Sequence, residues 1–248
     1  MKVLITGASS GIGKEFAKIF ARENYELVLV ARRKPLLLNL KKELEQKYNA
    51  KVDLIIEDLS DLNSVKRIRK KINNLHTLVN NAGFGDSGPF AKSNYDKNES
   101  MINVNITNLT NLTKLFLPDI IANKGKILNV ASVAAFQPGP FMSVYFATKS
   151  YVLHFSEGLS EELNKKGVSV TCLCPGPTRT EFDKVAGANF KGNIPSAKEV
   201  AEYGYKSLMK GKVVAVHDWK FRILVKLNRI LPRSVVRKLS SKITRENL

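Results

Sequence analysis

The chain has 248 residues, 44% of them hydrophobic, which is enough to bury the core of one large α/β domain or two small ones. Lysine and arginine number 40 against 22 aspartates and glutamates, so the formal net charge is +18; nucleic acid, anionic lipid or a merely solvated basic surface could explain it. No apolar run is long enough to cross a bilayer, and the apolar N-terminal segment is too short for a signal peptide, so we expect a cytoplasmic protein.

Apolar runs typical of buried strands alternate along the chain with amphipathic helical patterns. The expected strands cover residues 2–6, 26–31, 51–56, 77–80, 126–131, 168–174 and 212–216. The expected helices cover about 11–23, 35–48, 61–73, 96–121, 143–166 and 196–210. This alternation predicts right-handed crossovers and an α/β fold with a single doubly wound, Rossmann-type parallel sheet that has helices on both faces. Ligands of such sheets bind beyond the carboxyl ends of the strands.

The first strand breaks into a glycine-rich turn with the spacing Gly-x-x-x-Gly-x-Gly, which opens the first helix. Glycine lets the backbone approach a ligand, and the free N–H groups and the dipole of the helix favour an anion. An ordinary glycine-rich turn is the alternative, but the position directly after the first strand favours a dinucleotide pyrophosphate. The residues that we assign to this site are Gly7, Ser9, Ser10, Gly11, Ile12 and Gly13.

Two arginines, Arg32 and Arg33, end the second expected strand, and Arg32 stands nineteen residues after Gly13. In dinucleotide-binding folds an acidic residue about 20 positions on holds the ribose hydroxyls, whereas an arginine there accommodates a 2′-phosphate. A guanidinium can bind that phosphate in bidentate fashion, while a carboxylate would repel it. The register therefore favours NADP(H) over NAD(H), with solvated charge at a strand end as the alternative.

The two cysteines, Cys172 and Cys174, lie on the sixth expected strand. We expect their side chains on opposite faces of the strand, unable to bridge, and interpret them as reduced packing residues. No cluster of histidines or cysteines accompanies them, and His76, His154 and His217 match no ligand spacing, so no metal site is expected.

Further motifs in the expected order give the chain a family resemblance. "TGASSGIG" holds the glycine turn, "NNAG" occupies 80–83, Tyr145 and Lys149 form Tyr-x-x-x-Lys, and Ser132 precedes the tyrosine by thirteen residues. With these four motifs the chain resembles the short-chain dehydrogenase/reductase family over nearly its whole length, to about residue 216. The resemblance implies that residues 1–217 form the catalytic domain and that residues 218–248 extend it with basic helices.

The chemistry of three residues agrees with this resemblance. Tyr145 and Lys149 are one helical turn apart and share a face. A free tyrosine is a poor base at neutral pH, but an adjacent ammonium and an oxidised nicotinamide both favour its phenolate. Tyr145 is therefore expected to act as acid in reduction and as base in oxidation, Ser132 to hydrogen-bond the substrate oxygen, and Lys149 also to hold the nicotinamide ribose.

The resemblance assigns further positions. Asn105 matches the asparagine that completes the family's proton relay, through water, although it also lies in an asparagine-rich stretch. Asp58 and Leu59 match the pair that contacts adenine, although Asp58 could simply cap the following helix. The remaining cofactor residues that the resemblance implies are Asn81, Ala82 and Gly83 after the fourth strand, and Pro175, Gly176 and Thr180 after the sixth.

These assignments predict an NADP(H)-dependent oxidoreductase that transfers hydride between the nicotinamide and a carbonyl compound or secondary alcohol by a Ser-Tyr-Lys-Asn mechanism. The segments expected to line the substrate pocket are 84–90, 137–142 and 182–195, and the apolar residues Phe90, Phe136, Phe141 and Met142 suggest an apolar substrate. The alternative is a catalytically idle dinucleotide sensor or scaffold on the same fold. No nucleic-acid recognition motif stands out.

The expected assembly is a homo-oligomer, with a dimer formed through the helices at 96–121 and 143–166 favoured. The family tetramer is in doubt because the segment "KVVAVHDW" lacks the glycine-rich ending that is common among tetrameric relatives.

The C-terminal segment 218–248 holds nine of the Lys and Arg residues against two acidic ones, a net charge of +7 (9 − 2). Its pattern predicts two short amphipathic helices separated by Pro232. Apolar residues expected on one face of the first are Ile223, Leu224, Leu227, Ile230 and Leu231, with Arg222, Lys226, Arg229 and Arg233 on another; Val235, Val236, Leu239 and Ile243 begin the second. Their apolar faces could pack on the enzyme or a partner subunit, or they could bind an anionic membrane peripherally.

Overall fold

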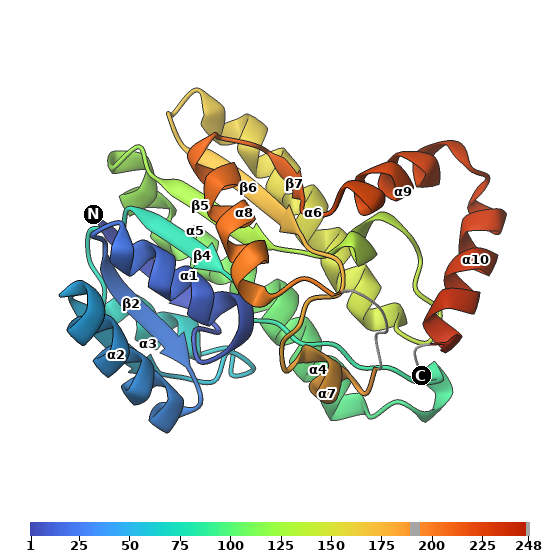
Figure 1. The fold of residues 1–248 in the computed structure, drawn as a ribbon, viewed down its shortest axis with the longest axis horizontal. Helices are drawn as coiled ribbons and strands as arrows, with labels where there is room; N and C mark the ends of the chain where they lie inside the picture. Colours follow the sequence, from blue (N-terminus) through green and yellow to red (C-terminus); the bar gives the residue numbers. More distant parts are fainter. Residues whose placement is uncertain (189–193, 247–248) are drawn as a thin grey trace.

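The computed structural model describes residues 1–188 and 194–246 (Figure 1). One sheet of seven parallel strands has the order β3-β2-β1-β4-β5-β6-β7. The strands are β1 (Lys2–Thr6), β2 (Glu26–Ala31), β3 (Val52–Ile56), β4 (Thr77–Asn80), β5 (Lys126–Val130), β6 (Ser169–Cys174) and β7 (Val214–Val216). Every expected strand is present, with only small shifts at its ends, and the doubly wound fold class is confirmed.

The strand order changes direction between β1 and β4. From β1 the chain builds outward through β2 and β3, and it then returns to add β4 on the other side. Val3, Leu4 and Ile5 of β1 are fully buried, because both faces of a parallel sheet are covered by its crossover helices. Ligands of doubly wound folds bind where the order reverses, so the cleft beyond β1 and β4 is the place for a site.

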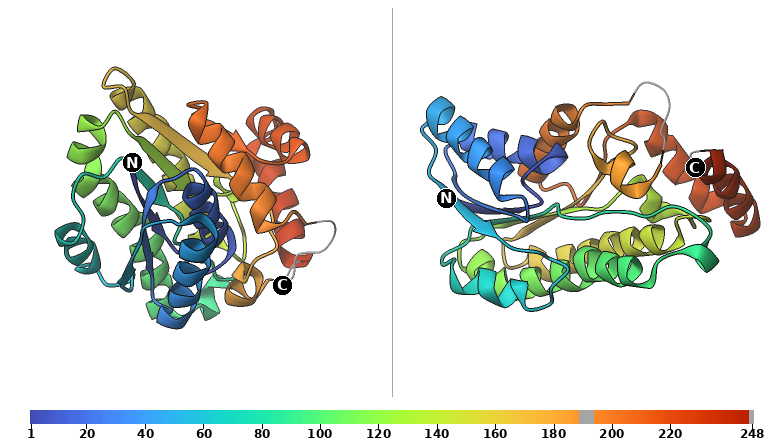
Figure 2. Two further views of the ribbon diagram at one scale, coloured as in Figure 1. Left: turned by 60° about the vertical axis from the view of Figure 1, so that its left-hand side comes forward. Right: turned by 90° about the horizontal axis from the view of Figure 1, so that it is seen from below.

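Helices form a layer on each face of the sheet (Figure 2). One layer holds α1 (Gly11–Arg22), α2 (Lys34–Tyr48) and α8 (Ala197–Met209). The other holds α3 (Ser64–Lys70), α5 (Leu109–Ala122) and α6 (Ser143–Asn164). Phe16 and Phe20 of α1 are fully buried in the first layer and Phe116 of α5 in the second, so both faces of the sheet have a close-packed core.

The helix expected over 96–121 is interrupted. The chain forms α4 (Tyr95–Ile102), a π-helical turn over Asn103–Asn108, and then α5. Asn108 within this turn donates hydrogen bonds to the backbone oxygens of Leu59 (2.8 Å) and Asp61 (3.0 Å). The wider turn therefore lets a buried asparagine tie the loop after β3 to the helix layer, and such turns are common at functional sites.

The helix expected over 61–73 is also shorter than predicted, since α3 covers Ser64–Lys70. The Asp61 side chain accepts a hydrogen bond from the backbone N–H of Asn63 (2.9 Å), which forms a turn before the helix begins. At the other end the backbone N–H groups of Lys71 and Ile72 donate to the oxygens three residues back (3.0 Å and 3.3 Å), a tighter turn that closes the helix at Lys70.

The expectation for the cysteines was wrong in one respect. Cys172 and Cys174 are two residues apart on β6, and residues at this spacing share a face of a strand. Their sulfur atoms lie 3.7 Å apart, both thiols are free, and both side chains are buried. They remain packing residues, but they pack side by side. Among the described residues no cluster of three or more histidine, cysteine or carboxylate side chains could hold a metal ion.

The last two helices are α9 (Trp219–Ile230) and α10 (Arg233–Glu246), as the sequence predicts. They lie at the end of the molecule opposite α2 and α3, beyond the sheet (Figures 1 and 2). In the described part of the chain no helix combines the length and apolarity that crossing a bilayer requires.

Candidate active site

A cavity of about 540 Å³ opens at the carboxyl ends of the strands, where the strand order reverses. Of the residues predicted from the sequence, those that line it are Gly7, Ser9, Ser10, Gly11, Ile12, Arg32, Arg33, Asp58, Leu59, Asn81, Ala82, Gly83, Ser132, Tyr145, Lys149, Pro175, Gly176 and Thr180. Two others, Gly13 and Asn105, lie behind this wall and are not part of its lining. Residues far apart in sequence thus meet in one place.

The glycine turn leaves the start of α1 open to this cavity. Gly7 has a positive φ of 65°, and a Cβ atom on it would lie 2.9 Å from the Cα atom of Ala82. Gly13 serves packing, since a Cβ atom there would lie 2.4 Å from the Asn81 side chain. Asn81 donates to the backbone oxygen of Thr6 (2.9 Å) and so holds the turn in place. The bare backbone and the helix N-terminus fit a pyrophosphate at this point.

Two arginines border the glycine turn. Arg33 donates to the hydroxyls of Ser9 (3.1 Å) and Ser10 (2.7 Å) and forms a 2.8 Å salt bridge with Glu181. Arg32 lies 3.4 Å from Asp58. Two guanidinium groups and two hydroxyls therefore gather beside the pyrophosphate position, a donor set that suits a second anionic group.

Asp58 has several polar partners at the rim of the cavity. Its Oδ1 atom accepts hydrogen bonds from both the backbone N–H and the hydroxyl of Ser60, each at 2.9 Å. Partial burial acts to raise the pKa of Asp58, but the hydrogen bonds from Ser60 and the charge of Arg32 outweigh it and hold the pKa below its usual value. Asp58 therefore remains an acceptor at neutral pH, and it also starts the turn that precedes α3.

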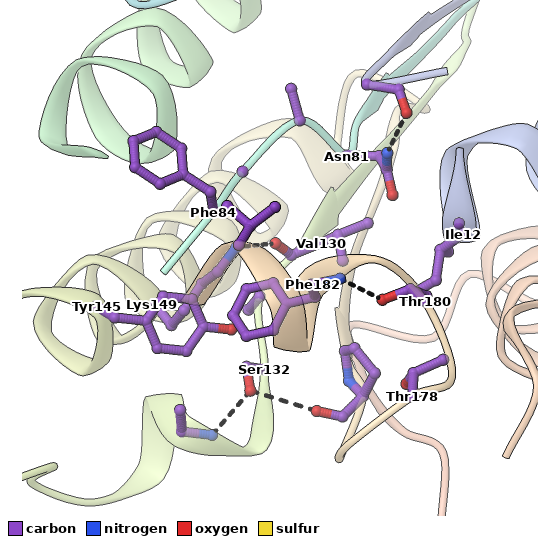
Figure 3. A pocket seen from close by; sticks show the side chains of 18 of the residues that line it. Ile12, Asn81, Phe84, Val130, Ser132, Tyr145, Lys149, Thr178, Thr180 and Phe182 are labelled. Atoms are coloured by element: carbon purple, nitrogen blue, oxygen red, sulfur yellow. Dashed lines mark hydrogen bonds between the residues drawn. The ribbon is translucent and has the colours of Figure 1, made fainter. Parts of the chain in front are cut away.

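Ser132, Tyr145 and Lys149 converge on the inner end of the cavity (Figure 3). Lys149 lies one turn after Tyr145 on α6, and its Nζ atom donates to the backbone oxygen of Val130 at the end of β5 (2.9 Å). Ser132 is the second residue after β5, and its hydroxyl accepts from the N–H of Ala134 (3.1 Å). The side chains are positioned by a helix and by the end of a strand, both rigid elements.

Burial dominates the protonation of this group. It raises the pKa of Tyr145 to about 12, although a hydrogen bond with Ser132 acts in the other direction. It lowers the pKa of Lys149 to about 8, since a buried ammonium loses its hydration. The ammonium that was expected to favour the phenolate does not overcome burial here. Tyr145 is thus a protonated phenol at neutral pH.

Asn105 lies in the π-helical turn behind Gly83. Its amide nitrogen donates to the backbone oxygen of Phe84 and to the hydroxyl of Thr148, each at 3.0 Å, and its oxygen accepts from the N–H of Phe84 (3.2 Å). A Cβ atom on Gly83 would lie 3.0 Å from the Asn105 oxygen and 3.2 Å from the Lys149 nitrogen. Asn105 and Lys149 therefore flank one glycine.

The loop after β6 closes the cavity from the other side. The Thr180 hydroxyl accepts a hydrogen bond from the N–H of Phe182, the first residue of α7 (Phe182–Ala186). The Phe182 ring lies 5.3 Å from the Tyr145 ring. Gly85 fits between them, because a Cβ atom there would lie 2.9 Å from Phe182 and 3.1 Å from Tyr145.

The C-terminal helices form the outer wall of the cavity. Phe221 of α9 presses on Gly176, where a Cβ atom would lie 2.4 Å from its ring. Asn228 of α9 donates to Gln137 (2.7 Å), and Ser240 of α10 donates to the backbone oxygen of Pro138 (2.6 Å). Packing on the enzyme body is therefore part of what these helices do, beside the substrate side of the cavity.

The apolar residues expected in the substrate pocket are only partly there. Met142 lines the cavity, whereas Phe90 is 67% exposed to solvent and Phe136 packs among α6 and β6 residues. Phe141 packs against the Arg245 guanidinium instead (5.1 Å). Of the expected segment 182–195, residues 189–193 lie outside the described residues. The apolar lining comes from other residues: Phe84, Phe146, Phe182, Phe221, Leu224 and Val225.

Sequence reasoning did not identify the partners supplied by α7 and α9. Glu181, which pairs with Arg33, follows the predicted Thr180 directly, and no pattern marks it as a partner of a residue so distant. The face of α9 that lines the cavity had a signal, since Phe221, Leu224, Val225 and Asn228 recur at helical spacing. The expectation that Leu224 shares a face with Ile223, Leu227, Ile230 and Leu231 was wrong, because Leu224 lines the cavity whereas the other four are exposed. Both sides of this helix are apolar, so periodicity alone did not reveal which side faces inward.

Comparisons with known proteins identify the family of the chain. The chain matches the short chain dehydrogenase family over residues 1–216. A very-long-chain 3-oxoacyl-CoA reductase from Anas platyrhynchos is 32% identical over 233 residues, which cover 89% of this chain and 75% of the relative.

Solved structures are similar as well. A short-chain dehydrogenase from Sphingobium yanoikuyae in complex with NADPH has a TM-score of 0.85 at 32% identity and covers 92% of this chain and 93% of its own. The bulky-bulky ketone specific alcohol dehydrogenase from Comamonas testosteroni has a TM-score of 0.81 at 30% identity, with 92% and 91% covered. The chain therefore belongs to the short-chain dehydrogenase family of oxidoreductases.

Proposed function

We propose that the protein is an NADP(H)-dependent oxidoreductase that interconverts an apolar ketone and the corresponding secondary alcohol. The observation that carries the proposal is the convergence of Ser132, Tyr145 and Lys149 on one cavity that the glycine turn, Arg32 and Arg33 also line. A catalytically idle dinucleotide sensor would have no use for a buried phenol and a buried ammonium, each of which is costly to bury.

The residues of the cavity fit a nicotinamide dinucleotide with a 2′-phosphate. The glycine turn would hold the pyrophosphate, and Arg32, Arg33 and the hydroxyls of Ser9 and Ser10 would hold the 2′-phosphate. Asp58 and Leu59 would border the adenine, and Lys149 would hold the nicotinamide ribose. When bound, this cofactor supplies the hydride in reduction and accepts it in oxidation.

The side chains perform the proton chemistry. The Ser132 hydroxyl and the Tyr145 phenol hydrogen-bond the substrate oxygen, and Tyr145 donates its proton as negative charge develops there. The ammonium of Lys149 stabilises the tyrosinate that remains. Asn105, which contacts Thr148 and lies across Gly83 from Lys149, would hold a water through which the proton is replaced.

The apolar wall of the cavity favours a bulky, apolar substrate. Phe84, Phe182 and Phe221 line it, and aromatic surfaces of this kind favour an apolar group. The names of two relatives, a very-long-chain 3-oxoacyl-CoA reductase and a bulky-bulky ketone specific alcohol dehydrogenase, agree with a substrate of this size.

A coenzyme-consumption assay tests the proposal. A panel of aliphatic, aryl and cyclic ketones is incubated with NADPH or NADH, and coenzyme absorbance is followed with the wild type and with Tyr145→Phe. We expect consumption of NADPH with bulky apolar ketones, faster than of NADH, and none with the variant. Coenzyme binding without turnover of any ketone or alcohol would indicate the idle sensor instead.

A further inference from the structure

The C-terminal hairpin, residues 219–246, has more apolar surface than packing on the enzyme requires. Phe221, Leu224 and Val225 of α9 line the cavity. Trp219, Ile223, Leu227 and Ile230, spaced by three or four residues on the opposite side of α9, are 63%, 50%, 47% and 80% exposed. A helix that is apolar on both sides exposes a second apolar stripe, and exposed stripes of this kind mark interaction surfaces.

The second helix of the hairpin continues this arrangement. Val236, Ser240 and Thr244 of α10 are buried toward the enzyme. Val235 and Leu239 point away from it and are 40% and 52% exposed. The outer face of the hairpin, defined here as Trp219, Ile223, Leu227, Ile230, Leu231, Val235 and Leu239, is thus contributed by both helices and by the turn between them.

Positive charge surrounds the outer face. Segment 218–248 has nine Lys and Arg residues against two acidic ones, hence a net charge of +7 (9 − 2). Lys226, Arg229, Lys238 and Lys242 are exposed beside the outer face. Within the described residues, no lysine or arginine of α9 or α10 forms a salt bridge with a carboxylate. The charge therefore remains available to a partner.

We propose that the outer face of the hairpin docks on an anionic lipid surface. A second copy of the chain is a poor partner, because a two-fold interface would set this net charge of +7 against an identical one. The boundary between acyl chains and anionic headgroups matches such a surface. The acyl chains accept the protruding apolar side chains, and the headgroups attract the lysines and arginines among them. The negative charge belongs to the lipid, and the apolar contact is made by its acyl chains.

Docking in this way sets the cavity beside the lipid, because α9 and α10 are also its outer wall. An apolar ketone dissolved in the bilayer would then lie next to the entrance. This consequence rests on the proposed function, whereas the docking itself depends only on the hairpin and is tested without coenzyme or substrate.

Vesicle flotation of the full-length protein tests the docking. The vesicles consist of phosphatidylcholine alone or of equal amounts of phosphatidylcholine and phosphatidylglycerol. We expect the protein to float only with the anionic vesicles at low ionic strength and to be released at about 1 M salt, where the screening length falls to about 3 Å. Failure to float with anionic vesicles at low ionic strength overturns the proposal, as does equal flotation with the neutral ones.

A matched pair of variants locates the contact. Leu227→Glu with Leu239→Glu places two carboxylates in the outer face, at positions 47% and 52% exposed. Leu38→Glu with Leu62→Glu makes the same charge change at two positions outside the hairpin, on α2 and just before α3, that are both 48% exposed. We expect the first variant to bind vesicles at least about tenfold more weakly and the second to bind nearly as the wild type does. Only the first variant removes apolar side chains from the lipid contact and sets carboxylates against the anionic headgroups. Equal effects of the two pairs contradict the proposal.

Trp219 gives an independent signal, because it is the only tryptophan of the chain and begins the outer face. We expect its emission to shift to shorter wavelength when anionic vesicles are added, as the indole leaves water. Flotation without this shift would mean that another surface binds. Sedimentation velocity without vesicles tests whether a second copy of the chain binds the outer face instead. If the wild type were a dimer and Leu227→Glu with Leu239→Glu made it a monomer, the outer face would be a contact between copies, and the proposal would be overturned.

Discussion

The ammonium nitrogen of Lys149 lies 5.8 Å from the centroid of the Tyr145 ring, and the two side chains are only 5% and 8% exposed. The same nitrogen is fixed by the backbone oxygen of Val130, at the end of β5. Burial therefore acts in opposite directions on the two groups: it keeps the phenol protonated and makes the ammonium easier to deprotonate. The residues that would carry the proton are held where their charged forms are least stable.

Tyr145→Phe removes the proton that we assign to the substrate oxygen. We expect kcat for ketone reduction to fall by about 10²-fold to 10⁴-fold, the usual contribution of a general acid, with NADPH affinity unchanged. Stopped-flow turnover and fluorescence titration with NADPH measure the two quantities. Tyr151→Phe is the matched control, because its hydroxyl on the same helix bonds only Thr110 among the described residues, and it should retain full activity.

Lys149→Met should make the protein more stable while inactivating it. The lowering of the Lys149 pKa from 10.5 to about 8 means that burying the ammonium destabilises the folded protein by about 3 kcal/mol. Losing the hydrogen bond to Val130 in the variant offsets about 1 kcal/mol of the gain. Below pH 8 the buried ammonium is charged in both the folded and the unfolded chain, so its penalty is fully present. Between pH 8 and 10.5 the unfolded chain binds the extra proton, and the stability of the wild type rises.

Urea unfolding of the two proteins checks this window. The variant should be about 2 kcal/mol more stable than the wild type at pH 7, and the advantage should disappear as the pH approaches 10.5. A difference that stays constant over this range would mean that Lys149 is not the titrating group.

Arg32→Asp tests the preference for the 2′-phosphate. A carboxylate would repel the phosphate but accept hydrogen bonds from a free 2′-hydroxyl, so NADPH should bind at least about tenfold more weakly while NADH binds at least as well. Isothermal titration with each coenzyme measures both affinities. Arg22→Asp makes the same change at an exposed site on α1 outside the cavity lining and should alter neither. Equal wild-type affinities for NADH and NADPH would refute the assignment.

Gly85→Ala should disturb catalysis without touching the coenzyme. The added methyl group would press on Phe182 and Tyr145 at 2.9 Å and 3.1 Å, so the phenol has to shift. A displacement of this kind can lower kcat by about tenfold or more, because the proton donor leaves its hydrogen-bonding position. Gly158→Ala on α6 is the control: nothing lies within 4 Å of its new methyl group, and both turnover and fold should persist. Normal turnover by Gly85→Ala would contradict the role given to the Tyr145 position.

The sequence predicted those parts of the fold that depend on local pattern. The continuous apolar runs of β1 and β2 indicate strands that are buried on both faces, and the glycine turn indicates an unusual backbone conformation. Each of these patterns is contained in a few consecutive residues. The interruption at Asn103–Asn108 was not predicted, because the helical pattern continues through it and the wider turn is favoured by tertiary contacts such as that of Asn108 with Leu59.

The site was predictable where motifs carry it and unpredictable where tertiary contacts do. Ser132, Tyr145 and Lys149 stand at recognisable spacings on one strand end and one helix. The contact of Phe182 with Tyr145 and the pairing of Glu181 with Arg33 depend on how the loop after β6 folds back over the cavity. The protonation of Tyr145 also follows from burial that its neighbours in sequence do not reveal.

Transfer of deuterium from coenzyme to product tests the central claim most directly. The wild type is incubated with NADPH that carries deuterium on the transferable face of the nicotinamide and with a bulky apolar ketone, and the alcohol is analysed by mass spectrometry. The account predicts an alcohol with one deuterium on its carbinol carbon, formed by the wild type and not by Tyr145→Phe. Unlabelled alcohol, no alcohol from any ketone of the panel, or equal labelling by the variant would contradict it.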